Sequence, residues 1–261
     1  MASRAEEKQR AREARLAVER AEQQSAKRRT AVLRLGLVAA LAVVVVVVAI
    51  VASSGGGSSN AGGASSGSGD AAAANALFKG IPQQGITLGG AKGKPTLVEF
   101  ADLQCPFCAE YSNQALPTVV KDYVKTGRIR YELRLRSFLG KDSETAAAGA
   151  AAAAKENRLY QFTDLFYQRQ GQENSGYVTD DFLRSIASAA GANPTAVVNA
   201  AHDPAGQPLV GQAEQEASSL GSNSTPDFYL RLAGGRLVKV SPQDLTPSAF
   251  TQALDQALSQ K

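Results

Sequence analysis

The stretch Thr96–Cys108, which reads TLVEFADLQCPFC, constrains the fold of this chain more than any other segment. Its first six residues form a short apolar run after Pro95, which is typical of a buried strand. A helix is predicted to begin at Pro106, because proline at the first helical position sacrifices no hydrogen bond. The sequence therefore places two cysteines at the junction between a buried strand and a helix.

A cysteine at the start of a helix faces unpaired backbone N–H groups and the positive end of the helix dipole. Both stabilise a thiolate, so Cys105 is predicted to be an exposed, attacking cysteine with a lowered pKa. Cys108 lies one turn further into the helix and is predicted to be the buried cysteine that resolves a mixed disulfide formed at Cys105. The pair is thus a candidate redox-active disulfide.

Three other interpretations of the cysteines stay open at this point. A structural disulfide between them would close so small a loop that it would restrict the unfolded chain little. Zinc takes four ligands, whereas the chain has two cysteines and a single distant histidine, His202, so only a metal shared between chains would serve. Two unreactive core cysteines are the third alternative. We predict no metal site and no cofactor.

Two further features accompany the cysteines. Glu99 lies six residues before Cys105 in an otherwise apolar strand, so it is predicted to be buried beneath the pair. A buried carboxyl group has a raised pKa and can exchange protons; an exposed position on the strand is the alternative. Thr225-Pro226 precedes another predicted strand, where the missing N–H of a proline does no harm.

The N-terminal third of the chain has a different composition. Residues 1–34 hold ten Lys/Arg and five Glu, a net charge of +5, whereas the rest holds 18 bases and 19 acids. The basic charge therefore belongs to a charged segment over residues 1–30, predicted to be cytoplasmic, and the folded part shows no basic stripe for nucleic acid.

Residues 31–52 form a predicted transmembrane helix, since every residue from Leu35 to Ala52 is apolar or glycine. A cleaved signal peptide is the alternative, although its charged leader would be much shorter. The basic leader predicts a cytoplasmic N-terminus and an extracytoplasmic domain, in a single-pass protein of the cell membrane. Residues 53–75 are almost wholly Gly, Ser, Ala and Asn and are predicted to be a flexible linker.

Residues 76–261 are predicted to be one α/β domain. After the first strand and helix, Arg128–Arg136 alternates apolar and charged residues, which predicts a half-buried strand with a basic exposed face. A helical insert follows at about 141–220. Two strands around Ala233–Gly235 then form a predicted hairpin, and a last helix opens at Thr246-Pro247. This order indicates helices packed on a central sheet.

With these features in order, the chain resembles the DsbA-like thiol–disulfide oxidoreductases of the thioredoxin superfamily over about residues 85–260. The resemblance rests on TLVEFADLQCPFC, on Ser224–Phe228 and on the placement of the insert. It implies a thioredoxin-like fold with a helical insertion, in which Cys105 and Cys108 carry out dithiol–disulfide exchange.

The resemblance also implies roles for other residues and partners. Glu99 takes the place of the buried acid, Pro226 that of a cis-proline packed against the disulfide, and Thr225 supplies backbone contacts to substrate, with Phe107 beside them. The implied substrates are reduced, unfolded exported polypeptides. The implied oxidase is a quinone-linked membrane protein of the DsbB or vitamin-K-epoxide-reductase-like type.

Two departures from the family leave the direction of exchange open. Phe107 stands where strongly oxidising members carry histidine, so a reductase or isomerase of the same fold is an alternative. Asp227 follows the proline where a small or apolar residue is usual, and we expect its charge to face solvent. A tethered chaperone-like domain with an inert disulfide is an alternative of another class.

Overall fold

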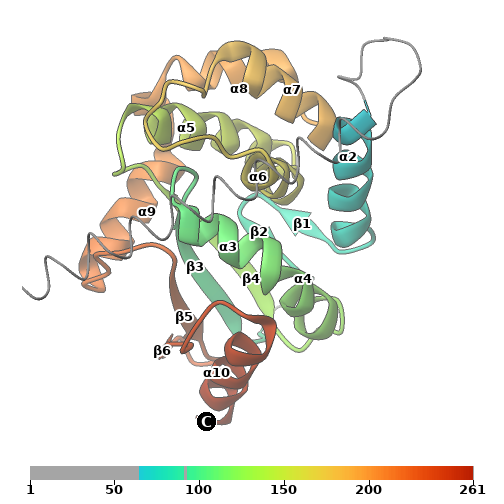
Figure 1. The fold of residues 1–261 in the computed structure, drawn as a ribbon. Helices are drawn as coiled ribbons and strands as arrows, with labels where there is room; N and C mark the ends of the chain where they lie inside the picture. The colour runs from blue at the N-terminus through green and yellow to red at the C-terminus, as the bar shows by residue number, and fades with distance from the viewer. Residues whose placement is uncertain (1–64, 91–92, 261) are drawn as a thin grey trace, which may run out of the picture. The chain divides into compact units, whose positions relative to one another are not determined.

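The computed structural model describes residues 65–90 and 93–260, and it is built on a six-stranded sheet (Figure 1). At its centre lies β3, Thr96–Asp102, in which all seven residues are buried. It pairs in parallel with β4, Arg130–Arg136, and antiparallel with β5, Asp227–Arg231. The predicted central strand is therefore confirmed, one residue longer than expected.

Short strands complete the two sides of the sheet. Its order is β1-β2-β4-β3-β5-β6, where β1 is Gln83–Gln84, β2 is Thr87–Leu88 and β6 is Leu237–Val240. The predicted hairpin between β5 and β6 is confirmed, and Gly235 makes the turn at φ 84°, a left-handed conformation that glycine adopts without strain.

One face of the sheet packs against the helix that follows the cysteines. The helix predicted to begin at Pro106 does so, and the helical segment divides into α3 (Pro106–Gln114), α4 (Leu116–Val119) and a π-helical turn, η1 (Val120–Val124). The last helix, α10, is Pro247–Ser259. The rings of Tyr111, Phe228 and Phe250, from α3, β5 and α10, lie with centroids 4.6–4.8 Å apart, which joins these elements.

The predicted helical insert is confirmed. Its helices are α5 (Lys141–Lys155), α6 (Leu159–Gln168), α7 (Asp180–Ala190), α8 (Pro194–Ala201), the short 3₁₀ helix η2 (Pro204–Gly206) and α9 (Pro208–Ser219). The alanine-rich α5 is buried along most of its length, because small side chains allow its neighbours to pack closely. In Figure 1 the helices α5 to α8 gather at one end of the sheet, beyond α3.

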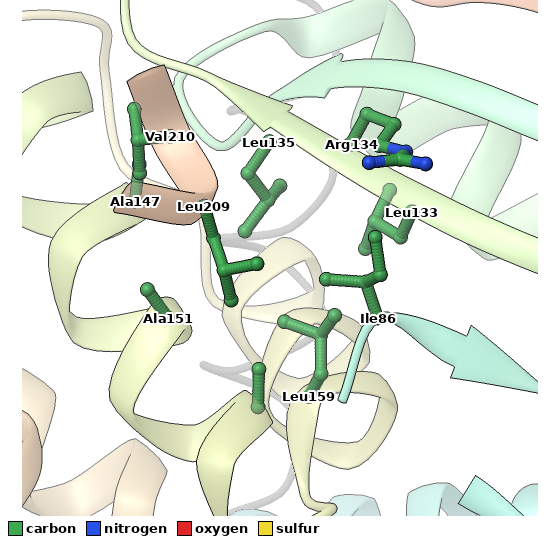
Figure 2. Close-up of a pocket in the computed structure, with 10 residues that line it drawn as sticks. Ile86, Leu133, Arg134, Leu135, Ala147, Ala151, Leu159, Leu209 and Val210 are labelled. Atoms are coloured by element: carbon green, nitrogen blue, oxygen red, sulfur yellow. The ribbon is translucent and has the colours of Figure 1, made fainter. Parts of the chain in front are cut away.

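A small cavity lies where the insert meets the sheet (Figure 2). Its volume is about 10 Å³, enough for about one water molecule. Its lining is almost entirely apolar, with Leu133 and Leu135 on one side and Ala147, Ala151 and Leu209 on the other. It is therefore a packing defect between insert and sheet and not a ligand site.

The opposite face of the sheet differs from the prediction. The basic residues of β4 are not fully exposed: Arg136 is 9% exposed, and Arg134 forms ion pairs with Glu132 and with Glu216 of α9. Ala217 of α9 also packs on the apolar residues of this face. The sequence pattern predicted the alternation of side chains along β4 correctly. The face expected to be exposed is covered by α9, which lies more than seventy residues further along the chain.

The predicted linker over 53–75 is wrong for its last part. Helix α2 spans Ser65–Phe78, because its alanines favour helix and Ala74 and Phe78 become buried against the insert. The charged segment 1–30 and the predicted transmembrane helix 31–52 lie outside the described residues. Within the residues that are described, no helix is long and apolar enough to cross a bilayer.

Candidate active site

The cysteine pair lies where β3 ends and α3 begins, as the sequence predicts. Cys105 is the N-cap residue of α3, with extended backbone, and Pro106 occupies the first turn. The backbone N–H of Cys105 donates to the carbonyl of Asp102 at 3.0 Å, which closes the tight turn between strand and helix. Both cysteines are free thiols in this structure.

The environment of Cys105 favours a thiolate. The thiol of Cys108 donates a hydrogen bond to it, which is the largest effect lowering the pKa of Cys105, and burial opposes it. The Thr225 side chain and the backbone N–H groups of Cys108 and Phe107 also lower the pKa, and the net value is about 6. A large fraction of Cys105 is therefore the nucleophilic thiolate at neutral pH.

Cys108 has the opposite character. It is completely buried, and burial raises the pKa of its thiol, followed by the hydrogen bond and the charge of Cys105 and then by Glu99. The two sulfurs thus have unequal roles, and only Cys105 is ready to attack at neutral pH.

The exposure predicted for Cys105 is wrong. The residue is 4% exposed, because the loop ending at Thr225 lies over its sulfur, and Phe107 is the residue of the motif that projects into solvent, at 60% exposed. An attacking partner therefore meets Phe107 and the Thr225–Pro226 loop before it reaches the sulfur.

The Thr225-Pro226 peptide bond is cis, as the resemblance implies. The Thr225 carbonyl accepts a hydrogen bond from the Cys105 Sγ at 3.2 Å, so this loop and the cysteine pair meet although 120 residues separate them.

The expectation that Asp227 faces solvent is wrong. Asp227 is 6% exposed, lies 3.1 Å from the Lys239 ammonium and accepts a hydrogen bond from the Tyr229 hydroxyl, so neighbouring side chains balance its charge.

Glu99 is buried on the same face of the sheet as the cysteines, and the prediction of burial is confirmed. Burial raises the pKa of its carboxyl group well above the ordinary value, and the charge of Cys105 adds to the effect. The hydroxyl of Tyr131 donates a hydrogen bond to this carboxyl group.

Asp102 and Gln170 hold the cysteine loop, and the sequence gives no sign of the role of Gln170. The Asp102 carboxylate accepts from the Gln104 backbone N–H at 2.8 Å and from the Ser143 hydroxyl. Gln170 donates to the Leu103 and Cys105 carbonyls at 2.8 and 3.1 Å. Asp102 is the last residue of β3, and its place after the apolar run indicates a loop or cap residue from the sequence alone, but nothing near Gln170 in the sequence points to the cysteines.

No cluster of His, Cys, Asp or Glu that could hold a metal occurs within residues 65–90 and 93–260. Glu99 and the two thiols lie together at the centre of the site, and groups of these kinds can exchange protons and disulfides.

Known proteins with similar sequences carry names from disulfide chemistry. The chain is 32% identical over 114 residues to a Bacillus cereus protein described as "Probable disulfide bond formation protein D", a match that covers 43% of this chain and 52% of that protein. It is 24% identical over 190 residues to a Rickettsia typhi protein described as "Putative protein-disulfide oxidoreductase RT0103", covering 72% and 67% of the two chains. The chain thus spans about half the length of the Bacillus relative.

Comparison with solved structures agrees on the fold. The oxidised form of BdbD from Bacillus subtilis superposes with a TM-score of 0.58 at 19% identity, covering 69% of this chain and 97% of the other. The sequence profile described as thioredoxin matches residues 82–256, which include all the site residues above. On this match and on the geometry of its cysteine pair, the chain belongs to the thioredoxin family.

Proposed function

We propose that the protein is a thiol–disulfide oxidoreductase that forms disulfides in exported polypeptides. The observation that carries this proposal is the opposite character of the two thiols, with a pKa of about 6 at Cys105 and a raised pKa at the buried Cys108. The names of the Bacillus and Rickettsia relatives support it.

In the oxidising direction, exchange starts from the Cys105–Cys108 disulfide. A substrate thiolate attacks the Cys105 sulfur, the bond between the cysteines breaks, and the electron pair goes to the Cys108 sulfur, which takes a proton from the Glu99 carboxyl group. A second substrate thiolate then attacks the substrate sulfur of the mixed disulfide and releases the Cys105 thiolate. The substrate gains a disulfide and the pair gains two electrons.

Substrate binding would use the surface around Cys105. Phe107 offers an exposed aromatic side chain, and Thr225 and Pro226 border the sulfur at the start of β5. An extended polypeptide placed along this loop would present its own cysteine to Cys105. Replacement of Phe107 should weaken the binding of such substrates.

Oxidation is the proposed direction because a low pKa at the attacking cysteine stabilises the reduced pair. The pKa of about 6 at Cys105 lies below the value of about 7 in thioredoxin and above about 3.5 in DsbA. We therefore expect a reduction potential between about −270 and −120 mV. Equilibration with glutathione buffers measures it, and a value at or below that of thioredoxin would favour the reductase alternative.

The activity itself is tested with a reduced, unfolded secreted protein as substrate. Cys105→Ser should abolish disulfide transfer, whereas Cys108→Ala should accumulate mixed disulfides with the substrate. Thr251→Ser, a change on α10 away from the cysteines, serves as control. Full transfer by Cys105→Ser would overturn the proposal. Resistance of the reduced Cys105 to alkylation would instead favour a binding domain with an inert disulfide.

We further propose that residues 31–52 anchor the protein in the cell membrane with its catalytic domain outside the cytoplasm. The apolar run and the basic leader support this topology. Alkaline phosphatase fused after Lys261 should be active in cells, and an inactive fusion would overturn the topology.

A quinone-linked membrane oxidase is the proposed electron acceptor of the reduced cysteine pair. Isolated membranes should reoxidise the reduced protein only while their quinone is oxidised.

A further inference from the structure

Glu99 is surrounded by groups that carry no permanent charge. It lies between Leu133 of β4 and Phe228 of β5 in the sheet and is 3% exposed. Besides Tyr131 of β4, the titratable groups that interact with its charge come from α3, from the N-cap of α3 and from α6: they are Cys105, Cys108, Tyr111, Tyr160 and Tyr167. A carboxylate formed here depends on a hydrogen bond for its stabilisation, because a buried charge is costly unless it is paired.

Tyr131 supplies that hydrogen bond. It lies on β4, opposite Leu97, so its side chain is on the same face of the sheet as Glu99. It is 1% exposed, and its hydroxyl donates to the Glu99 Oε2. A hydroxyl donor favours the charged form of a carboxyl group and opposes the effect of burial.

The ring of Tyr131 is held in place by the insert. Its centroid lies 5.5 Å from that of Tyr160, on α6. The hydroxyl of Tyr160 donates to the backbone carbonyls of Tyr131 and Ile86, at 2.9 and 2.6 Å. The donor that contacts Glu99 is therefore fixed by contacts of its ring and its backbone, and little conformational freedom is lost when the bond forms.

Tyr111 provides an internal comparison. It lies on α3, it is completely buried, and the Glu99 charge also acts on it. Its hydroxyl has no hydrogen-bond partner among the described residues. Tyr131 and Tyr111 are thus both buried phenols near the Glu99 carboxyl group, of which Tyr131 donates to it and Tyr111 does not.

We propose that Tyr131 is a positioning residue for disulfide exchange, which holds the Glu99 carboxylate ready to exchange a proton with Cys108. The inference rests on the proposed function. When the reduced pair reacts with an aromatic disulfide such as 5,5′-dithiobis(2-nitrobenzoate), the Cys105 thiolate attacks and releases one nitrothiobenzoate. Cys108 then passes its proton to Glu99, attacks the Cys105 sulfur and releases the second. Without Tyr131, fewer Glu99 groups are ionised at a given pH.

The test follows the two releases separately by absorbance, in rapid mixing between pH 5 and 9, with the reduced protein. In Tyr131→Phe the second release should slow by about tenfold near neutral pH, which corresponds to one unit of pKa, and its pH midpoint should rise. The first release should change little. Tyr111→Phe, which removes a hydroxyl without a partner, should leave both phases unchanged.

A double-mutant cycle distinguishes an effect of Tyr131 through Glu99 from a purely structural role of Tyr131. In a Glu99→Gln background, Tyr131→Phe should have no further effect on the second release. An equal slowing in both backgrounds, or a change in melting temperature alone, would overturn the proposal. If Tyr131→Phe folds poorly, 3-fluorotyrosine at position 131 provides the opposite test, since a stronger donor should lower the pH midpoint; no movement of the midpoint would contradict the proposal. Absence of the first release in the unmodified protein would instead refute the proposed function.

Discussion

Two buried glutamates lie on opposite faces of the same sheet, on adjacent strands, and their carboxyl groups have different partners. Glu99, on β3, is 3% exposed and faces the cysteines with a tyrosine hydroxyl as its hydrogen-bond donor. Glu132, on β4, is 7% exposed and lies 3.0 Å from both Arg134 and Arg231. One carboxyl group is left without an ion pair among these contacts, and the other is fully balanced.

The difference shows how the fold separates chemistry from structure. On the face of Glu132, Glu216 of α9 also contacts Arg134 and Arg231, so that strand, strand and helix are joined by one network of charges. The two arginines thus pair with the Glu132 carboxylate, so this group serves to join neighbouring elements of the fold. On the face of Glu99, burial raises the pKa, so that this group can both give and accept a proton.

The largest expected effect distinguishes the two glutamates by activity. Glu99→Gln removes the proton exchange with Cys108 and should slow the Cys108-dependent release of nitrothiobenzoate by about 10²-fold, at the lower end of the range for general acid–base catalysis. Glu132→Gln makes the same chemical change on the opposite face and should leave both releases at the unmodified rate. Equal slowing in the two variants would mean that the faces are not functionally separate.

The second effect concerns the free energy of unfolding, and here the larger change is expected at Glu132. Glu132→Leu removes the more buried of the two carboxylates that Arg134 and Arg231 share, and we expect a loss of about 3 kcal/mol in the free energy of unfolding. Urea denaturation measures it. The disulfide exchange rate of the folded variant should stay unchanged. A loss below about 1 kcal/mol would show that Glu216 alone is sufficient to balance the two arginines.

A third buried carboxyl group extends the comparison. Asp164 of α6 is 5% exposed, and its Oδ2 accepts from the Gln168 amide at 2.7 Å. Burial raises its pKa from 3.8 to about 6. The folded state therefore binds this proton more tightly than the unfolded state, and stability is lost as the pH rises from about 3.8 through about 6.

Asp164→Asn should remove that loss. At pH 8 the variant should be more stable than the unmodified protein by about 3 kcal/mol, as one unit of pKa corresponds to about 1.4 kcal/mol. At pH 3.5 the two should be equally stable. Urea denaturation at both pH values checks the prediction. A constant difference at both pH values would contradict titration of Asp164 as the cause.

These contrasts also show what the sequence could predict. The strand, the helix start and the unequal cysteines were all local features of residues 96–108, and the structure has them in that order. Burial of Glu99 followed from its apolar strand neighbours. The insert and the β5–β6 hairpin were also recognisable, because helical patterning and turn residues act over a few positions.

The features that the sequence did not predict depend on segments far apart in the chain. The alternation in β4 indicated a basic exposed face, but whether that face is covered depends on α9. The Thr225 carbonyl reaches over Cys105 from 120 residues away, which explains why Cys105 is less exposed than its place in the motif suggested. The burial of Asp227 could not be predicted from its neighbours in the sequence, because its partner Lys239 lies on the next strand.

The smallest expected effect comes from an ion pair at the surface. Asp255 and Arg128 are 3.0 Å apart, as close as the pairs of Glu132, but their side chains are 54% and 50% exposed. Water screens such a pair, so Asp255→Asn should change the free energy of unfolding by less than about 0.5 kcal/mol. Two further features reduce the loss of stability in Asp255→Asn. The Arg128 guanidinium keeps its contact with the Tyr123 ring, 4.3 Å from the centroid. In addition, Asp255 lies near the C-terminal end of α10, where a negative charge is unfavourable.

Urea denaturation of Asp255→Asn and of Glu132→Leu compares ion pairs with equal distances and unequal burial. If burial determines how much an ion pair contributes to the free energy of unfolding, the losses in the two variants should differ several-fold. Salt at 1 M should abolish the smaller loss and leave most of the larger one. Similar losses in the two variants would instead make distance the deciding quantity. The charge network under α9 would then be no stronger than a surface contact, and the contrast between Glu99 and Glu132 would rest on their hydrogen-bond donors alone.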